Sequence, residues 1–428
     1  MRWFPSSHFF GRASILVAAT PVTIAKVAAI AFQIGSLAGL GYYLACLWSA
    51  RSYLRDRLAM REAEEDESAV PATPPVSILK PLKGKDPEIY ASFRTHCLQD
   101  YPAYEIVFGV SDPDDPALDA VERLREEFPE SAIQVIVCRE TLGANTKVSN
   151  LAQMARVARY QTLVVSDSDI RVPKNYLRHV VAPLEDDNVG MVTCLYRGIS
   201  GDTPSSRLES LGISTDFCAG VLVARSLEGT IRFGLGSTMA FRRADLEAIG
   251  GFESFADYLA DDYELGSRIA DLGKEIRVSD VVVETFLPSY SWRGFIEHQL
   301  RWARGVRDAR PRGYLGLVLT FSWQWAMLAL ALSGGPIWAW RSVGMALVLR
   351  IVVALTVGLG VLEDRQVLIL LPLLPLRDAI AVYIWVVSFA SDEVTWRGDR
   401  FLLKHGKLIR AGEDESTSSQ APEQATRE

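Results

Sequence analysis

An uncharged apolar run near the N-terminus constrains the architecture more than any other feature of this sequence. It covers the 22 residues from Val27 to Trp48, which is long enough for a helix to cross the hydrocarbon core of a bilayer. Tyr42 and Tyr43 suit an aromatic belt at the membrane interface. A cleaved signal peptide is the alternative, but no small-residue cleavage site follows the run. We therefore expect residues 1–50 to form an N-terminal transmembrane anchor.

Basic residues mark the expected cytoplasmic side of this anchor. Directly after the apolar run, arginines stand at positions 51, 55, 57 and 61. Cytoplasmic loops carry an excess of Arg and Lys. The chain after residue 50 is therefore expected to face the cytoplasm.

The last third contains three more apolar segments, at 313–340, 342–362 and 366–390. We expect transmembrane or re-entrant helices over residues 313–392. Three crossings would place the tail, residues 393–428, on the outside. The tail begins with the basic stretch WRGDRFLLKHGKLIR, which argues for the inside, and ends in an acidic stretch that predicts disorder. The pattern leaves open whether one segment is re-entrant or lies in the interface.

Three charged residues fall within these apolar segments. Arg350 lies in the second segment, and Arg377 and Asp378 lie in the third. A charge in the middle of a bilayer is costly unless it is paired or faces a polar cavity. We therefore expect these residues to have charged or polar partners.

The region between the apolar segments alternates as an α/β domain does. Residues 51–75 are charged and then Pro-rich, which predicts a linker. Within 76–312, apolar runs predict strands at 76–80, 105–111, 133–138, 162–166 and 190–195. Amphipathic stretches predict helices near 87–99, 116–128, 146–159 and 173–184. This alternation predicts a doubly wound, Rossmann-like sheet, whose ligands bind beyond the carboxyl ends of the strands.

Acidic residues stand where such a sheet binds its ligands. The runs EIVFGV and TLVV are followed by acids, and another acidic pair opens the stretch DDYELGSRIADLG. These acids are Asp112, Asp167, Asp169, Asp261 and Asp262. Each could be a turn residue or a helix N-cap. Their joint position near strand ends favours a binding site.

The spacing of Asp167 and Asp169 fits a metal site. Alternation along a strand places both carboxylates on one face, with Cα atoms about 6.6 Å apart. Oxygen-only ligation favours Mg²⁺ or Mn²⁺, which take further ligands from water and substrate phosphates. The pair therefore predicts a metal–diphosphate site. A phosphatase is the alternative, but there Gly-Thr usually follows the pair, whereas this chain has Ile170 and Arg171.

Composition argues against other kinds of site. The net charge of −7 gives no support to nucleic-acid binding, which usually shows a basic surplus. The five cysteines are scattered without a CxxC pair, and no HExxH occurs. Neither a disulfide framework nor a zinc site is therefore indicated.

Stretches between residues 77 and 305 together resemble a known family. They are, in order, SILKPLKGKDP, QDYPAYEIVFGVSDPDDPA, TKVSNL, SDSDIRV, AIGGFE, LADDYELGSRIADLG and HQLRWARG. The set resembles family 2/21-type glycosyltransferases of the ceramide glucosyltransferase group. Within that group, VTCLYRG at 192–198 and HQLRW are most similar to the bacterial hopanoid biosynthesis-associated glycosyltransferase. The resemblance implies a GT-A fold for 76–312 and a multi-pass protein of the bacterial inner membrane, with its catalytic domain facing the cytoplasm.

The resemblance also implies roles for individual residues. Asp112 would hydrogen-bond the uracil of UDP. Asp169 would bind the metal, and Asp167, a second candidate ligand, would lie nearer the ribose. Asp262 would be the general base, with a helix N-cap as the alternative. Lys147 would add a contact to the diphosphate, with a solvated charge as the alternative.

The family motif Q/RxxRW corresponds to His298–Trp302. His298 replaces the usual Gln or Arg, which leaves the role of this position open. Arg301 would neutralise the departing diphosphate, and Trp302 would wall the acceptor pocket. Attraction to the membrane surface and interfacial anchoring are the respective alternatives. Residues 208–227 are expected to form an amphipathic helix on the acceptor side, with a core helix as the alternative.

The combined prediction is an inverting membrane glycosyltransferase that moves one sugar from a UDP-sugar to a lipid alcohol. For a hopanoid acceptor such as bacteriohopanetetrol, the resemblance implies UDP-N-acetylglucosamine as the donor. The alternative is a ceramide glucosyltransferase that uses UDP-glucose. A processive polysaccharide synthase is less favoured, because such enzymes usually have more membrane segments and Gln in place of His298. A catalytically inactive scaffold is disfavoured because the acidic residues and Arg301 are all present.

Overall fold

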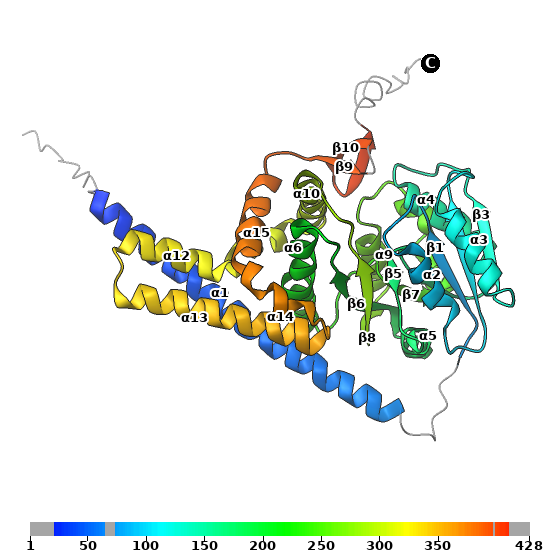
Figure 1. Ribbon diagram of the computed structural model, residues 1–428, viewed down its shortest axis with the longest axis horizontal. Helices are drawn as coiled ribbons and strands as arrows, with labels where there is room; N and C mark the ends of the chain where they lie inside the picture. The colour runs from blue at the N-terminus through cyan, green and yellow to red at the C-terminus, as the bar shows by residue number, and fades with distance from the viewer. Residues whose placement is uncertain (1–20, 65–72, 397–398, 411–428) are drawn as a thin grey trace, which may run out of the picture.

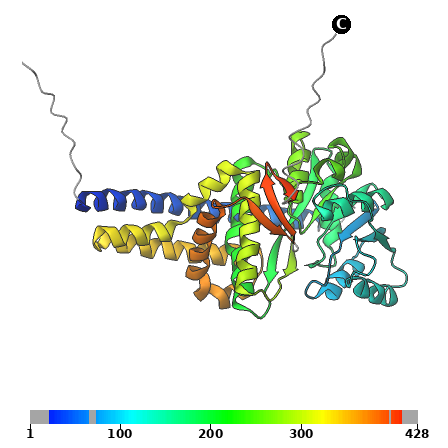
Figure 2. The ribbon, with the colours of Figure 1, turned by 90° about the horizontal axis from the view of Figure 1, so that it is seen from above.

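A computed structural model describes residues 21–64, 73–396 and 399–410. Three helices project side by side from an α/β domain (Figures 1 and 2): α1 (Pro21–Glu64), α12 (Ser322–Ser333) and α13 (Ile337–Ala354). Helix α1 contains the apolar run and continues past it to Glu64. Residues 51–64 are therefore helical where a linker is predicted, because their Leu, Ala, Met, Arg and Glu residues are good helix formers.

The domain is built on an eight-stranded sheet in the order β3-β2-β1-β4-β7-β6-β8-β5. Its strands are β1 (Val76–Pro81), β2 (Tyr104–Val110), β3 (Ile133–Val137), β4 (Thr162–Val165), β5 (Ile170–Arg171), β6 (Val189–Ile199), β7 (Met239–Arg242) and β8 (Glu275–Phe286). The first four strands are parallel, as predicted. The rest of the sheet is mixed, because β7 runs antiparallel to β4 and β6, and β5 runs antiparallel to β8.

Helices cover both faces of the sheet. On one face lie α2 (Ile89–Cys97), α3 (Leu118–Glu127) and α5 (Tyr176–Val181), and on the other lie α4 (Thr146–Val157) and α9 (Asp261–Asp271). Successive residues of a strand point to opposite faces. In β1, Ile78 packs into the first core and Leu79 into the second. A strand buried on both sides is apolar throughout, which explains the short continuous runs in the sequence.

A second layer of helices lies between the sheet and the projecting helices (Figure 1). It consists of α6 (Pro204–Gly212), α7 (Cys218–Glu228), α10 (Trp292–Ala309), α14 (Gln366–Leu370) and α15 (Leu374–Ser388). A π-helical turn, Ile213–Phe217, joins α6 to α7. The helical stretch predicted over 208–227 is thus present, with a π-helical turn within it.

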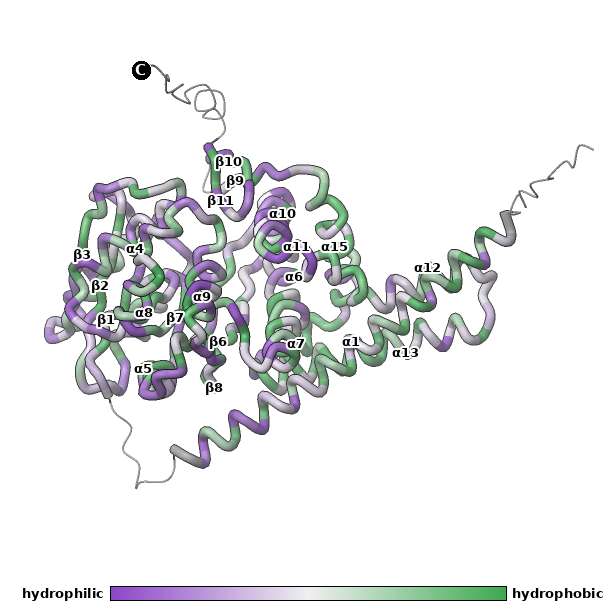
Figure 3. Tube along the Cα trace, turned by 180° about the vertical axis from the view of Figure 1, so that it is seen from behind, coloured by the Kyte–Doolittle hydropathy of each residue, from purple (hydrophilic) through white to green (hydrophobic). Residues whose placement is uncertain are grey.

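Within the described part of the chain, three helices are long and apolar enough to cross a membrane: Thr23–Glu62, Ile337–Val361 and Gln366–Ser388. A further pair, Pro311–Thr320 and Ser322–Ser333, passes the same test together but is bent by 54°. Figure 3 shows apolar residues along the length of α12, α13 and α15. These segments make the chain a membrane protein by length and composition.

The basic part of the tail folds back on the α/β domain. It forms a three-stranded antiparallel sheet of β9 (Glu393–Trp396), β10 (Asp399–Lys404) and β11 (Lys407–Arg410). The amide of Leu259 donates to the carbonyl of Gly406 over 3.0 Å, and that of Leu408 to Asp257 over 2.7 Å. The tail and the domain therefore lie on the same side of the projecting helices' apolar region. Residues 411–428, where disorder is predicted, lie outside the described residues.

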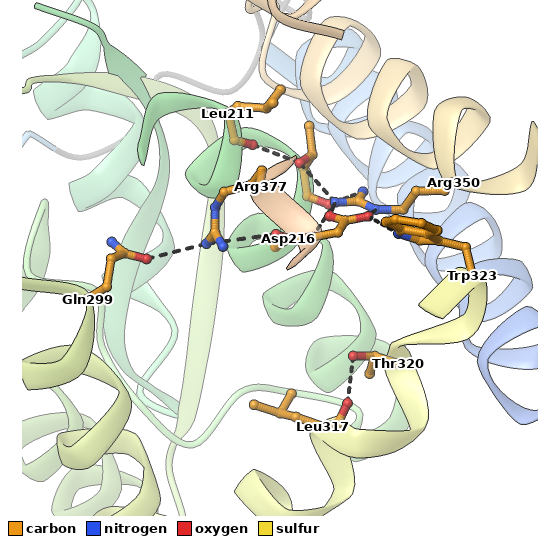
Figure 4. A network of polar contacts seen from close by, with 10 residues as sticks. Leu211, Asp216, Gln299, Leu317, Thr320, Trp323, Arg350 and Arg377 are labelled. Atoms are coloured by element: carbon orange, nitrogen blue, oxygen red, sulfur yellow. Dashed lines mark hydrogen bonds and ion pairs between the residues drawn. The ribbon is translucent and has the colours of Figure 1, made fainter. Parts of the chain in front are cut away.

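The charges inside the apolar segments are paired, as expected (Figure 4). Arg350 of α13 is buried and donates twice to the Asp378 carboxylate of α15, over 2.9 Å from Nε and 2.7 Å from Nη2. Its Nη2 also lies 2.5 Å from Oδ1 of Asp216 in the π-helical turn. Arg377 lies 3.8 Å from Asp216 and donates to Gln299 of α10 over 3.4 Å. This network ties the projecting helices to the domain.

Candidate active site at the strand ends

The aspartates at the end of β4 lie at the edge of the sheet, where sequence predicts them. Asp169 Oδ2 accepts a hydrogen bond of 2.5 Å from Thr285 Oγ1 of β8. Burial and the charge of Asp167 raise the pKa of Asp169 to about 6. Strand β5, which follows at once, pairs with β8. That pairing holds Asp169 beside Thr285, a neighbour that the sequence does not reveal.

A buried lysine holds the turn after β4 through hydrogen bonds. Lys80 of β1 has no solvent exposure, and its Nζ donates to the carbonyl of Asp167 over 2.8 Å and to Ser166 Oγ over 3.2 Å. Burial lowers the pKa of Lys80 to about 7. A charged residue rarely lies in a sheet core without a partner. The lone lysine in the apolar strand SILKP was the signal that could have identified it.

Lys147 joins the β4 turn to the start of α9. It lies in the first turn of α4, which Asn145 caps by accepting from the amide of Val148 over 3.2 Å. The Nζ atom is 2.8 Å from Asp167 Oδ1 and 3.0 Å from Asp261 Oδ2. Burial opposes the lysine charge, but the two aspartates outweigh it and raise the pKa of Lys147 above its ordinary value. These contacts do not fit the alternative in which Lys147 is a charge surrounded by solvent.

Asp262 is held by backbone amides from two elements. Its Oδ1 accepts from the amide of Tyr263 over 2.8 Å, and its Oδ2 from that of Gly236 over 3.1 Å. Burial and the neighbouring Asp261 raise its pKa to about 6. A carboxylate with this pKa is ionised at neutral pH and still basic enough to accept a proton.

A glycine loop lets α9 and the β4 turn approach each other closely. A Cβ on Gly266 of α9 would lie 2.3 Å from the amide nitrogen of Gly234, so the helix and the loop touch through bare backbone. A Cβ on Gly236 would lie 3.0 Å from Asp167 Oδ2 and 3.6 Å from Asp262 Oδ2. The two predicted functional carboxylates therefore flank a single glycine.

Asp112 stands apart from these contacts, at the end of β2. Its side chain is exposed, and Oδ1 accepts from the amide of Asp114 over 2.9 Å. The nearby Asp115 is buried and accepts from Gly84 and Ala117 amides at 3.0 and 2.9 Å, which fixes the loops after β1 and β2 together. Strands β2, β1 and β4 are adjacent and parallel, so Asp112 lies on the same sheet edge as Asp167.

The residues at the β4 turn fit a hard divalent cation. Among the described residues no group of three or more His, Cys, Asp or Glu side chains could hold a metal. Asp167 and Asp169 offer oxygen ligands only, which suits an ion that takes its other ligands from water and phosphate. Burial and mutual repulsion disfavour the ionised form of Asp169, and a cation between the carboxylates would remove this penalty.

The HQLRW motif lies on α10, facing a row of aromatic rings. The ring centroid of His298 lies 5.0 Å from that of Trp302 with the rings tilted by 59°, and the Phe217 centroid lies 6.2 Å from that of Trp302. Tyr196 continues the row, 5.4 Å from Phe217, and Tyr290 lies 5.4 Å from His298. Trp302 thus lies within a row of aromatic rings, and its role as a wall of the acceptor pocket stays a prediction.

Arg301 contributes charge to this side of the site. Burial, and after it the charge of Arg301, lowers the pKa of His298 to about 3. Burial raises the pKa of Glu209 to about 7, and the charges of Arg377 and then Arg301 oppose this shift. Glu209 lies on α6 and is almost fully buried. Sequence reasoning did not identify it, because the stretch LESLG carries no local signal of function.

The chain is similar in sequence to known glycosyltransferases. The model of "Glycosyl transferase family 21" matches residues 31–409. Ceramide glucosyltransferase 3 of Caenorhabditis elegans is 27% identical over 256 residues, which cover 60% of this chain and 54% of that relative. Ceramide glucosyltransferase 1 of the same organism is 22% identical over 367 residues, covering 82% and 76% respectively. The matched part of the chain thus spans about half the length of the first relative.

A solved structure shares the fold. It is a mannosyltransferase from Pyrobaculum calidifontis in complex with GDP-Man and Mn²⁺. The TM-score is 0.52 at 23% sequence identity, and the match covers 86% of this chain and 97% of that one. This likeness confirms the predicted GT-A fold.

Proposed function

The chain belongs to glycosyl transferase family 21 and is a glycosyltransferase; on that premise we propose that it moves one sugar from a UDP-sugar to a membrane lipid alcohol, with inversion. One observation carries the proposal. Asp167, at the predicted donor site, and Asp262, the predicted base, flank the same glycine, Gly236. A diphosphate held at the β4 turn would thus place its sugar beside a carboxylate that can accept the proton of an incoming hydroxyl.

Charge around the β4 turn suits a departing nucleoside diphosphate. Breaking the sugar–phosphate bond builds negative charge on the β-phosphate oxygen. A divalent cation bound by Asp169 and Asp167 would supply Lewis-acid stabilisation of that charge. The complex of the Pyrobaculum protein with Mn²⁺ supports a cation of this class. Lys147 and Arg301 would add positive charge, and a guanidinium matches phosphate geometry and stays charged.

Asp262 would act as the general base. A lipid alcohol is a poor nucleophile until it loses its proton, and proton transfer to a positioned carboxylate typically contributes about 10² to 10⁴ in rate. Two backbone amides orient Asp262 toward the Gly236 loop. The alternative role of Asp262 as a helix N-cap is wrong, because Ala260 is the N-cap of α9 and Asp262 lies within its first turn, where an acid is favoured by the helix dipole. Asp112, on the same sheet edge, would bind the uracil of the donor.

The acceptor is proposed to be a hopanoid polyol such as bacteriohopanetetrol, with UDP-N-acetylglucosamine as donor. The motifs VTCLYRG and HQLRW support this choice. The second candidate is ceramide with UDP-glucose, which the two nematode ceramide glucosyltransferases favour. Either lipid buries a large apolar area in the bilayer, at about 25 cal/mol per Å². The enzyme must therefore meet its acceptor at the membrane surface.

The membrane arrangement proposed here brings the site to that surface. The tail sheet and the domain share one side, so the chain between them crosses an even number of times. We propose that α1 is the first crossing of the membrane. Segments 311–333 and 337–361 are then the second and third crossings, which together return the chain to the side of the domain. Helix α15 lies across the projecting helices beside α6 and α10 (Figure 1) and is proposed to lie in the interface, on the cytoplasmic face of a bacterial inner membrane. A C-terminal tag should then be labelled from the cytoplasmic side, and labelling from the outside would contradict this arrangement.

The test is a product assay on purified protein in detergent or lipid. UDP-N-acetylglucosamine, UDP-glucose and UDP-galactose are each offered with bacteriohopanetetrol and with ceramide, in Mg²⁺, Mn²⁺ or EDTA. We expect a glycosylated hopanoid by mass spectrometry, and no product in EDTA. Transfer to ceramide alone would replace the hopanoid by the second candidate. Absence of any product from all donors would contradict the function itself.

A further inference from the structure

Glu209 brings a carboxylate into the protein interior without a hydrogen-bond partner. The residue is 2% exposed, and neither carboxylate oxygen has a hydrogen-bond partner among the described residues. Nε2 of His298 lies 3.5 Å from its Oε1. Buried polar atoms are almost always satisfied, so an unpaired buried carboxylate calls for an explanation.

His298 does not supply the missing interaction. Its Nδ1 is engaged with the hydroxyl of Tyr290 at 3.2 Å, and its Nε2 is itself a buried atom without a hydrogen-bond partner. The ring is neutral, since burial and Arg301 hold its pKa far below the physiological range. A neutral ring cannot form an ion pair with Glu209. Two buried polar groups without hydrogen-bond partners, one on α6 and one on α10, therefore lie 3.5 Å apart.

A chain of aromatic ring contacts connects His298 to the region of the proposed base. The row of rings from Tyr290 through His298, Trp302 and Phe217 leads to Tyr196. Tyr196 in turn lies near the charges of Asp262, Glu209 and Asp169, each of which adds to the effect of burial in raising its pKa. Glu209 thus lies on the acceptor side of the catalytic carboxylate, in the helical layer next to the projecting helices.

We propose that Glu209 and Nε2 of His298 bind a second polar hydrogen of the acceptor, a hydroxyl or amide N–H close to the hydroxyl that is glycosylated. This inference rests on the proposed function and specifies its substrate class. A carboxylate accepts such hydrogens and a neutral imidazole donates or accepts one. The enzyme therefore selects lipids with a polyol or amino-alcohol head over lipids with one hydroxyl.

The consequence for selectivity is large. A site built to hydrogen-bond a substrate hydroxyl rejects the analogue that lacks it, because its own buried polar groups stay unpaired. We expect wild-type kcat/KM to be at least about 10²-fold higher for a polyol lipid than for its one-hydroxyl analogue. Replacing Glu209 with Ala should remove most of this preference and raise the KM for the polyol.

The experiment compares bacteriohopanetetrol with a hopanol that has a single terminal hydroxyl, and ceramide with its 3-deoxy analogue, in mixed micelles. Wild type, Glu209→Ala, Glu209→Gln and the control Glu105→Gln are assayed with the same donor. Glu105 is as deeply buried (1% exposed), but its Oε1 accepts from Ser77 Oγ and the Arg159 amide at 2.7 and 2.6 Å, and its Oε2 lies 3.4 Å from Arg159 Nε. It lies on β2, away from the site.

The expected result is a preference that is lost in Glu209→Ala, weakened in Glu209→Gln and kept in Glu105→Gln, with the KM for UDP-sugar unchanged throughout. Thermal stability should not fall in Glu209→Gln, since no hydrogen bond is lost, and should fall in Glu105→Gln. A preference that survives Glu209→Ala, or a wild type that uses both analogues equally well, would overturn the inference while leaving the transfer function intact. Failure of wild type to glycosylate any of the lipids would instead contradict the proposed function.

Discussion

Lys147 and Asp167 form an ion pair of 2.8 Å between Nζ and Oδ1 that joins helix α4 to the turn after β4. The same Nζ lies 3.0 Å from Oδ2 of Asp261, so one lysine holds the β4 turn and the start of helix α9 together. The spacing between the β4 turn and Asp262 thus depends on a cation of the protein itself. The predictions below test this arrangement and its surroundings.

Lys147→Met should weaken UDP-sugar binding by about tenfold or more, because a charge next to the diphosphate is lost. It should also lower the free energy of unfolding by about 1–2 kcal/mol. Breaking a fully buried pair costs about 3–5 kcal/mol, but 36% of the Asp167 side chain is exposed. Calorimetric titration with UDP and thermal unfolding measure both effects. Unchanged UDP affinity would contradict a donor-site role for Lys147.

The rate of transfer should rise with pH through about 6 and level off above about 7. Burial and Asp261 raise the pKa of Asp262 to about 6, and the base works only when it is ionised, which is above that pKa. Lys147 lowers this pKa by its charge, so Lys147→Met should move the midpoint to higher pH. A kcat profile that is flat between pH 5 and 8 would exclude this assignment.

Gly236→Ala should lower kcat by about 10² with little loss of stability. The added Cβ would lie 3.0 Å from Asp167 Oδ2 and 3.6 Å from Asp262 Oδ2, and displacing reacting groups by about 1 Å costs about that factor. Gly344→Ala in α13 is a matched control, because a Cβ there meets nothing within 4 Å. Equal activity of the two variants would show that the Gly236 loop does not set the site geometry.

Arg350→Met should destabilise the protein by about 3–5 kcal/mol, since it leaves the buried Asp378 uncompensated. The double variant Arg350→Met, Asp378→Leu should recover part of this loss, because the pair is removed together. For comparison, Lys85→Met breaks an exposed pair with Asp119 and should cost no more than about 1 kcal/mol. Thermal unfolding in detergent measures all three. If the loss of stability in the double variant equalled the sum of the losses in the two single variants, the two residues would not interact.

The parallel half of the sheet and the strand-end aspartates could be predicted because each depends on local pattern. Fully buried strands such as β4 are mostly apolar, and acids that follow them reach the sheet edge by the geometry of the strand. The mixed half of the sheet could not be predicted, because β5 is only two residues long and β7 only four residues long. Their antiparallel pairing is set by contacts between segments that are distant in sequence.

The tail sheet carried a local signal that the prediction of a basic tail did not use. Strands β10 and β11 are joined by His405 and Gly406, whose φ angles are +52° and +82°. Two residues with positive φ between alternating strands form the hairpin turn that a following Gly favours. By contrast, the role of Glu209 follows from which groups surround it after folding, and no local pattern in the sequence reveals that.

The most direct test of the account is Asp262→Asn, which removes the proposed base and preserves the shape of the side chain. Purified wild type and variant are compared in a single turnover with UDP-sugar and the polyol lipid, and UDP-sugar affinity is measured by calorimetry. We expect donor affinity within about twofold of wild type and transfer slower by about 10² to 10⁴. Transfer at the wild-type rate would contradict a mechanism in which Asp262 takes the proton of the acceptor.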